Sequence, residues 1–199
     1  MNPTDILKSE HRVIEQVLDC LTKIAAAAEA RGRLEAEPAR DAIDFFRNFA
    51  DRCHHGKEET HLFPAMEAKG FPRDGGPTGV MLAEHEQGRQ HVRGMAEAVD
   101  RAASGDPSAV QQFCTHAEGY VELLRDHIMK EDHCLFGMAN QAFSPAEQAR
   151  LLEQFEQVEQ EHLVEGTHQR FLDVAERLAR RYGVVKPAAV GQVCGCGHH

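Results

Sequence analysis

Apolar side chains recur at steps of three and four residues along most of the chain, a pattern that predicts amphipathic helices. Turns rich in Gly and Pro divide this pattern into five segments. The predicted helices cover about 4–30, a segment that begins after Pro38, 78–104, a segment that begins at Pro107, and 145–182. The chain is therefore expected to be all-α, with the first four helices arranged as two hairpins.

Two stretches of the chain share the frame His-x-x-Lys-Glu-x-x-x-Leu-Phe, and each stretch contains one His-x-x-x-Glu. A Glu-His dipeptide precedes each copy of the frame by almost the same interval. Each predicted hairpin thus carries one lone histidine and one His-x-x-x-Glu. These repeated residues are His11, His54, Glu58, His85, His127 and Glu131.

All of these residues lie on the stripe where a stable helix places apolar side chains. Burying a polar or charged group there costs several kcal/mol unless something compensates. A His and a Glu four residues apart on a helix face the same way, so each pair offers a nitrogen ligand and a carboxylate that can bridge. The four histidines and two glutamates are therefore expected to bind two transition-metal ions. Imidazole and carboxylate without thiolate suit iron or manganese better than structural zinc.

The composition narrows the class of protein. The 199 residues suffice for one domain with a real core, and metal ligation would explain the surplus of 13 histidines. The net charge of −10 argues against non-specific binding to nucleic acid. The N-terminus has no signal-peptide pattern, and no apolar run is long enough to span a bilayer. We therefore expect a cytoplasmic protein with six reduced cysteines and with neither a nucleic-acid nor a membrane partner.

The constellation of His11, His85 and the two His-x-x-x-Glu motifs resembles the hemerythrin-like (HHE cation-binding) family over roughly residues 1–140. The resemblance implies a four-helix bundle of the hemerythrin type that holds an oxo- or hydroxo-bridged di-iron centre, with the six repeated residues as ligands. Oxygen-carrying hemerythrins place a second histidine one turn after the helix-3 histidine, where this chain has Arg89. The chain therefore resembles instead the bacterial proteins linked to iron–sulfur repair, nitric-oxide handling, peroxide breakdown, and iron or oxygen sensing.

The expected organisation is an up-down four-helix bundle at 1–140, a fifth helix packed on the bundle at 144–183, and a tail that contains Cys and His at 184–199. The resemblance implies a non-haem di-iron protein of the redox or oxidative-stress response that binds or reacts with O2, NO or peroxide. If the protein is an enzyme, it is expected to be a peroxide- or NO-directed oxidoreductase with a redox partner that the sequence does not identify. The alternatives are a sensor of iron or oxygen without turnover and a ferritin-like iron store.

Further residues of the bundle could take part. His61 follows Glu58 at the Glu-x-x-His spacing of ferritins, and it either binds metal or lies behind the ligands. Tyr120 either reaches an open position at the metal or packs in the core. His55 and Glu59 form another His-x-x-x-Glu, but an α-helix turns each of them about 100° away from the neighbouring ligand. We expect this pair at the surface or behind the ligands, with His61 or Glu59 as the best candidate for a general acid.

The C-terminal part offers weaker candidates. His162 lies on the apolar line of the fifth helix, which either only covers the bundle or supplies an additional ligand. Cys194, Cys196 and His198 belong to the terminal Cys-Gly-Cys-Gly-His-His. This cluster could bind copper, zinc or iron or form a Cys-x-Cys disulfide, and the alternative is a tail that binds no metal.

Overall fold

The computed structural model describes residues 2–162 and 167–185, and these residues form helices and turns but no strand. The α-helices are α1 (Pro3–Arg31), α2 (Ala36–Phe45), α3 (Phe63–Ala68), α4 (Pro77–Ala103), α5 (Pro107–Lys130), α6 (Phe136–Ala142), α7 (Pro145–His162) and α8 (Thr167–Tyr182). Three π-helical segments lie between them, namely η1 (Phe46–His55), η2 (Glu58–Leu62) and η3 (Glu131–Leu135). No helix in this part of the chain is both long and apolar enough to cross a membrane. The predicted all-α class is confirmed for the described residues.

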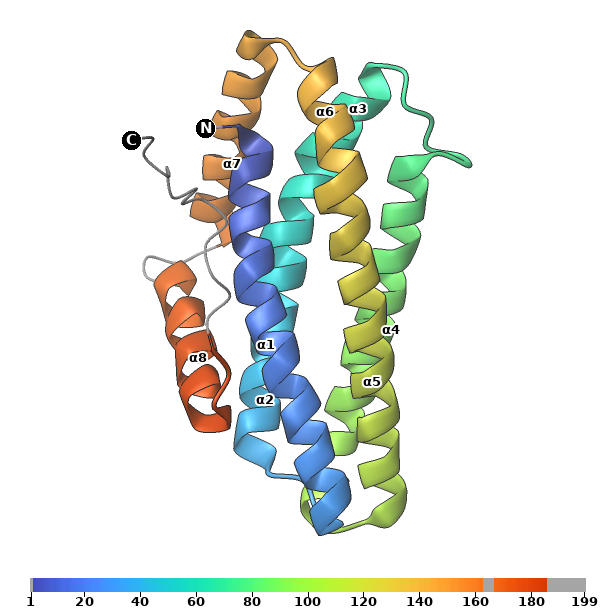
Figure 1. The fold of residues 1–199 in the computed structure, drawn as a ribbon, viewed down its shortest axis with the longest axis vertical. Helices are drawn as coiled ribbons and strands as arrows, with labels where there is room; N and C mark the ends of the chain where they lie inside the picture. The colour runs from blue at the N-terminus through green and yellow to red at the C-terminus, as the bar shows by residue number, and fades with distance from the viewer. Residues whose placement is uncertain (1, 163–166, 186–199) are drawn as a thin grey trace, which may run out of the picture.

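The helices lie side by side as long rods (Figure 1). Helix α1 contacts α2 and α5, and α4 contacts α2 and α5, so these four helices enclose a common interior. Helices α1 and α4 are the first and third rods. The second rod runs from α2 through η1 and η2 into α3, and the fourth runs from α5 through η3 into α6. Helix α7 packs against α1, η1 and η2, whereas α8 packs against α1 and α2.

The capping residues explain where the helices begin and end. Asn2 and Asp5 form a capping box at the start of α1, and Gly32 ends α1 with a φ of 65°. Asp106 caps α5 by accepting the backbone N–H groups of residues 108 and 109. Ser144 and Glu147 form a capping box at the start of α7, with hydrogen bonds in both directions.

The second and fourth rods each change from α- to π-helix at the repeated motifs. Residues His54 and Glu58 lie in η1 and η2, and Glu131 opens η3. The sequence pattern predicts plain α-helices here, so these segments are a difference from the expectation. A π-helix closes i→i+5 hydrogen bonds, and such wide turns occur frequently at functional sites.

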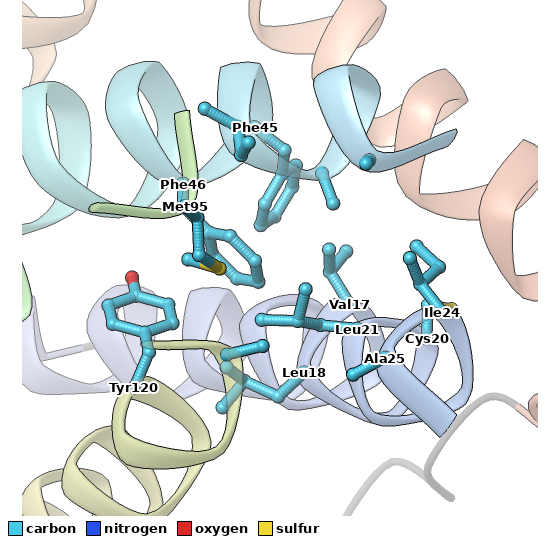
Figure 2. Close-up of a cluster of buried hydrophobic side chains, with 14 of the residues drawn as sticks. Val17, Leu18, Cys20, Leu21, Ile24, Ala25, Phe45, Phe46, Met95 and Tyr120 are labelled. Atoms are coloured by element: carbon cyan, nitrogen blue, oxygen red, sulfur yellow. The ribbon is translucent and has the colours of Figure 1, made fainter. Parts of the chain in front are cut away.

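Two apolar clusters fill the interior, and a polar layer separates them. Figure 2 shows part of the larger cluster, in which Phe46 and Tyr120 face side chains of α1. On α1, Leu7 belongs to the smaller cluster, His11 follows, and Ile14 belongs to the larger cluster. On α4 the order is the same, with Met81, His85 and Val92, whereas from α5 into η3 it is reversed, from Leu124 through His127 to Leu135. The predicted ligands thus lie in a layer with apolar walls on both sides.

The prediction of one helix over 145–182 is wrong, because α7 and α8 are separate helices. The intervening residues 163–166 are outside the described part of the chain. The sequence has a glycine at 166, and glycine is a poor helix former. His162 ends α7, but its side chain is outside what the structure describes, as are Cys194, Cys196 and His198.

Candidate metal centre

The structure brings the six predicted ligands together in the polar layer, where each is at most 1% exposed. Two groups of side chains could each hold a cation, with ligand atoms that lie within 4.8 Å of one another. The first group is His11, His54, Glu58 and Glu131, and the second is His55, Glu58, His85 and His127. Glu58 belongs to both groups, so the two positions meet at its carboxylate.

The four predicted histidine ligands converge in two pairs. The Nε2 atoms of His11 and His54 are 2.9 Å apart, and those of His85 and His127 are 3.1 Å apart. Two imidazole nitrogens bound at right angles to one ion, with bonds of about 2.1 Å, lie about 3 Å apart. The spacing within each pair therefore suits one ion per pair.

A carboxylate faces the other nitrogen of each of these rings. Nδ1 of His11 donates to Asp132 (2.9 Å), that of His54 to Glu10 (2.9 Å), that of His85 to Glu59 (2.7 Å) and that of His127 to Glu84 (2.9 Å). Because a carboxylate accepts only, each Nδ1 carries the hydrogen, and the lone pair of each Nε2 points into the centre. Partners of this kind fix the tautomer and the orientation of metal-binding histidines.

These contacts explain the rest of the sequence repeat. The Glu of each Glu-His dipeptide, Glu10 or Glu84, holds the motif histidine of its own hairpin. The ammonium groups of Lys57 and Lys130, from the two copies of the frame, donate to Glu10 and Glu84 respectively. The sequence showed these glutamates and lysines as repeated residues without indicating a role for them.

The two central glutamates lie between the histidine pairs. Glu58 Oε1 is 3.5 Å from His54 Nε2, and Glu58 Oε2 is 3.5 Å from His85 Nε2. Glu131 Oε2 is 3.2 Å from His11 Nε2 and 3.3 Å from His127 Nε2. Each carboxylate thus reaches one histidine of each pair, as a bridging ligand must.

No hydrogen-bond partner is found for either oxygen of Glu58 or of Glu131, although all four atoms are buried. A buried carboxylate without a donor is costly, and proteins rarely leave one in place without a purpose. Two cations would compensate both carboxylates and the facing lone pairs of the histidines. The residues present therefore fit a pair of bound metal ions.

When no ion is bound, protons compensate these charges instead. Burial alone would lower the pKa of His127, but Glu131 raises it to about 9. Burial would also lower the pKa of His11, but Asp132 and Glu131 raise it. Burial and Glu131 raise the pKa of Glu58 well above its usual range, whereas His127 and His11 outweigh burial and hold the pKa of Glu131 well below it. In the metal-free centre, His127 is thus protonated near neutral pH, and the shifts of His11 and Glu58 also favour their protonated forms.

His55 is buried beside the centre rather than at the surface, which was one of its two expected positions. Its ring stacks on that of His85 with centroids 3.8 Å apart, and burial and His85 lower the pKa of His55 to about 3. The 100° step of an α-helix would turn His55 away from the neighbouring ligand, whereas His55 ends the π-helix η1. Glu59 accepts a hydrogen bond from Nδ1 of His85 and therefore lies behind the ligands, which was one of its two expected positions.

The two other candidates in the described part of the chain, His61 and Tyr120, lie outside both groups. His61 is half-buried and lines a surface cavity with Phe143 and Leu151. Tyr120 is buried, and its ring contacts Phe46 edge to face at 4.8 Å. Burial raises the pKa of Tyr120, which is therefore a neutral phenol at neutral pH.

A cavity of about 230 Å³ opens beside the second group. Its lining includes His55, His85 and Tyr120, together with four arginines, one of which is Arg89. Arg89 donates to Asp51 (2.9 Å) and to Glu59 (2.7 Å). A small molecule can therefore approach the histidine side of the centre along a wall that carries positive charge.

Comparisons with known proteins agree with this geometry. A family model described as the hemerythrin HHE cation binding domain matches residues 2–139, a range that includes all six predicted ligands. Three similar proteins, one from Mycobacterium bovis and two from strains of Mycobacterium tuberculosis, are described only as uncharacterized. Each is 24% identical over 182 residues, a match that covers 92% of this chain and 70% of the relative. No solved structure matches the chain. The family match extends over more than half of the sequence, and the chain therefore belongs to the hemerythrin HHE cation-binding domain family.

Proposed function

We propose that the chain is a non-haem di-iron protein in which an up-down four-helix bundle of the hemerythrin type holds the two ions, and that this centre binds or reacts with O2, NO or peroxide. One observation carries the proposal. Two pairs of Nε2 atoms face Glu58 and Glu131, whose four oxygens are buried without a hydrogen-bond partner. The six residues of the sequence repeat are the proposed ligands.

The donor set supports iron. The centre offers imidazole and carboxylate groups, which suit iron better than the soft sites that thiolates form. Cys53 belongs to a separate group with Glu10 and Glu159. The ammonium of Lys57 donates to both of those carboxylates and so replaces a metal ion there.

Two bound iron ions would supply a redox couple and open positions for a small ligand. The protein would contribute four neutral imidazoles whose orientation is fixed by carboxylates, and Glu58 and Glu131 would offset the positive charge. The apolar clusters on both sides of the layer exclude water from the centre. The cavity beside His55 and His85 would admit a small polar or anionic molecule, because arginines line its wall.

Elemental analysis and the visible spectrum test the proposal. We expect two iron ions per chain and an oxo-bridge charge-transfer band, both for the full chain and for a version that ends at Gly183. Extra metal that is lost only on truncation would assign a second site to the terminal Cys and His residues. Little iron in either version would contradict the di-iron proposal. Consumption of peroxide or NO by the loaded protein would favour an enzyme, and its absence would favour a sensor.

Metal binding is also expected to release protons. Cations must displace the proton from His127, and the raised pKa values of His11 and Glu58 favour protons there as well, so binding of two divalent ions near pH 7 should release at least one proton. Because the pKa of His127 is raised to about 9, the affinity for metal should rise with pH up to about that value. Calorimetric titration in buffers of different ionisation enthalpy measures the number of protons. A release close to zero would show that the metal-free centre is not protonated as the structure indicates.

A further inference from the structure

A further pair of histidines lies where α4 and α5 meet at the surface of the bundle. His91 on α4 and His116 on α5 are both partly exposed, and their Nδ1 atoms are 3.4 Å apart. The ring centroids are 5.5 Å apart at an interplanar angle of 72°. For nitrogens at this spacing, that is almost the largest distance between centroids that two imidazole rings can reach, and it requires each Nδ1 to point toward the other ring. The two Nδ1 atoms therefore face the same space from opposite sides.

The spacing of these two nitrogens suits a metal ion. Two nitrogens bound tetrahedrally to one ion, with bonds of about 2.1 Å, lie about 3.4 Å apart. Burial and the neighbouring His116 lower the pKa of His91, whose ring is therefore neutral near pH 7, and the neutral imidazole is the form that binds metal. Without an ion, one Nδ1 carries a hydrogen and donates to the other. With an ion between them, both rings would carry the hydrogen on Nε2 instead.

A glycine on the opposite helix makes room for each ring. A Cβ atom on Gly94 would lie 2.2 Å from Nε2 of His116, and a Cβ atom on Gly119 would lie 2.4 Å from Cε1 of His91. Each ring thus lies directly over the backbone of the neighbouring helix, and both helices carry the sequence His-x-x-Gly at this contact. Glycine destabilises the interior of a helix relative to alanine, so two glycines here are explained by the space that the two imidazoles need.

We propose that His91 and His116 form a surface site for one divalent transition-metal ion of the Zn²⁺ or Cu²⁺ class, with water completing the coordination. Imidazole suits zinc and copper, and Cu²⁺ binds such donors more tightly than the other divalent ions of the series. The inference is independent of the proposed di-iron centre, because neither histidine belongs to its two ligand groups. The ion would join α4 to α5 and would therefore stabilise the folded chain in proportion to its affinity.

The test must separate this site from other metal-binding groups of the chain. His91→Gln and His116→Gln each remove one imidazole, from a different helix, so either variant decides the question if the other does not fold. His133→Gln is the control, because His133 is an exposed histidine that belongs to neither ligand group. The full chain, with the interior ions that it retains on purification, would be titrated with Zn²⁺ alone and with Cu²⁺ alone. The readouts are the number of ions bound per chain, their dissociation constants by calorimetry, the melting temperature and the electron paramagnetic resonance spectrum of bound Cu²⁺.

We expect the wild type and His133→Gln to share one ion that His91→Gln and His116→Gln bind at least roughly 100-fold more weakly. Added Zn²⁺ should raise the melting temperature of the wild type more than that of either variant. The difference between the Cu²⁺ spectra of the wild type and of His116→Gln should show hyperfine splitting from two nitrogen nuclei. Unchanged affinity and an unchanged Cu²⁺ spectrum in a folded variant would overturn the proposal, because the two histidines would then only fill the contact between the helices. That result would leave the di-iron proposal intact, since the iron content of the interior is measured separately.

Discussion

Replacing Lys57 with methionine is expected to lower the free energy of unfolding by about 3–5 kcal/mol. The side chain of Lys57 is completely buried, and its ammonium donates to Glu10 and, at 2.6 Å, to Glu159. Burial would lower the pKa of Lys57, but Glu10 outweighs this effect and raises it, so the lysine is charged. Methionine fills a similar volume but leaves the buried carboxylate of Glu10 without its cation. Urea denaturation with a chelator present measures the loss without a contribution from bound metal.

Lys130→Met is the matched control, because Lys130 occupies the same position in the second copy of the repeat. Its ammonium donates to Glu84, but its side chain is 36% exposed. Water screens an exposed ion pair, so the expected loss is less than about 1 kcal/mol. Equal losses in the two variants would show that the burial of Lys57 does not decide the effect.

A second substitution tests the cause of the destabilisation. In Lys57→Met with Glu10→Gln, the amide oxygen still accepts from His54 Nδ1, and the carboxylate that remains without the ammonium, that of Glu159, is 37% exposed to water. We expect this double variant to regain most of the lost stability. In the single variant, burial raises the pKa of Glu10 without opposition from Lys57. The protonated acid forms at low pH, so the single variant should lose less stability at pH 5 than at pH 8.

The sequence was sufficient to predict the helical class, the family and the buried layer that contains the six repeated residues. It was sufficient because these residues recur in two copies, and one copy supports the interpretation of the other. The supporting residues were equally visible as repeats, since Glu10 and Glu84 precede the lone histidines and a lysine precedes each central glutamate. Their role could not be inferred, because it depends on contacts between neighbouring helices.

His55 could not be placed from the sequence, and the reason is local geometry. An α-helical projection turns His55 away from the layer, whereas η1 is a π-helix whose wider turn brings it against His85. Steps of three and four residues do not distinguish an α-helix from an α-helix that contains π-helical turns. The separation of α7 from α8 was missed for a different reason, because the apolar pattern of the sequence is similar in both helices.

Glu58→Gln and Glu131→Gln are both expected to abolish binding of a metal pair, but they should differ in the metal-free protein. Burial and Glu131 raise the pKa of Glu58 well above its usual range, which favours the neutral carboxylic acid in the metal-free protein. Glutamine replaces that acid with a neutral amide of the same shape. We therefore expect the stability of metal-free Glu58→Gln to lie within about 1 kcal/mol of the wild type, as for a substitution that removes no charge.

Glu131→Gln removes a true anion, because His127 and His11 outweigh burial and hold the pKa of Glu131 well below its usual range. Both histidines then lose the charge that stabilises their protonated forms. The raised pKa of His127, about 9 in the folded protein, contributes stability that is fully present below pH 6 and is lost as the pH rises through 9. Metal-free Glu131→Gln should therefore be about 1–3 kcal/mol less stable than the wild type at pH 6, and this difference should disappear above about pH 9.

Each variant is denatured at pH 6 and above pH 9, first with a chelator and then with added Fe²⁺. This comparison separates the effect on the metal-free protein from the effect on metal binding. At a free ion concentration of about 100 times the dissociation constant, each ion adds about 2.7 kcal/mol to the stability of the wild type. Both variants should lose this gain, because each central carboxylate faces one histidine of each pair. If Glu58→Gln instead destabilised the metal-free protein as much as Glu131→Gln, Glu58 would be ionised there. Two negative charges would then share the centre without metal, and the protonation pattern inferred from the structure would be wrong.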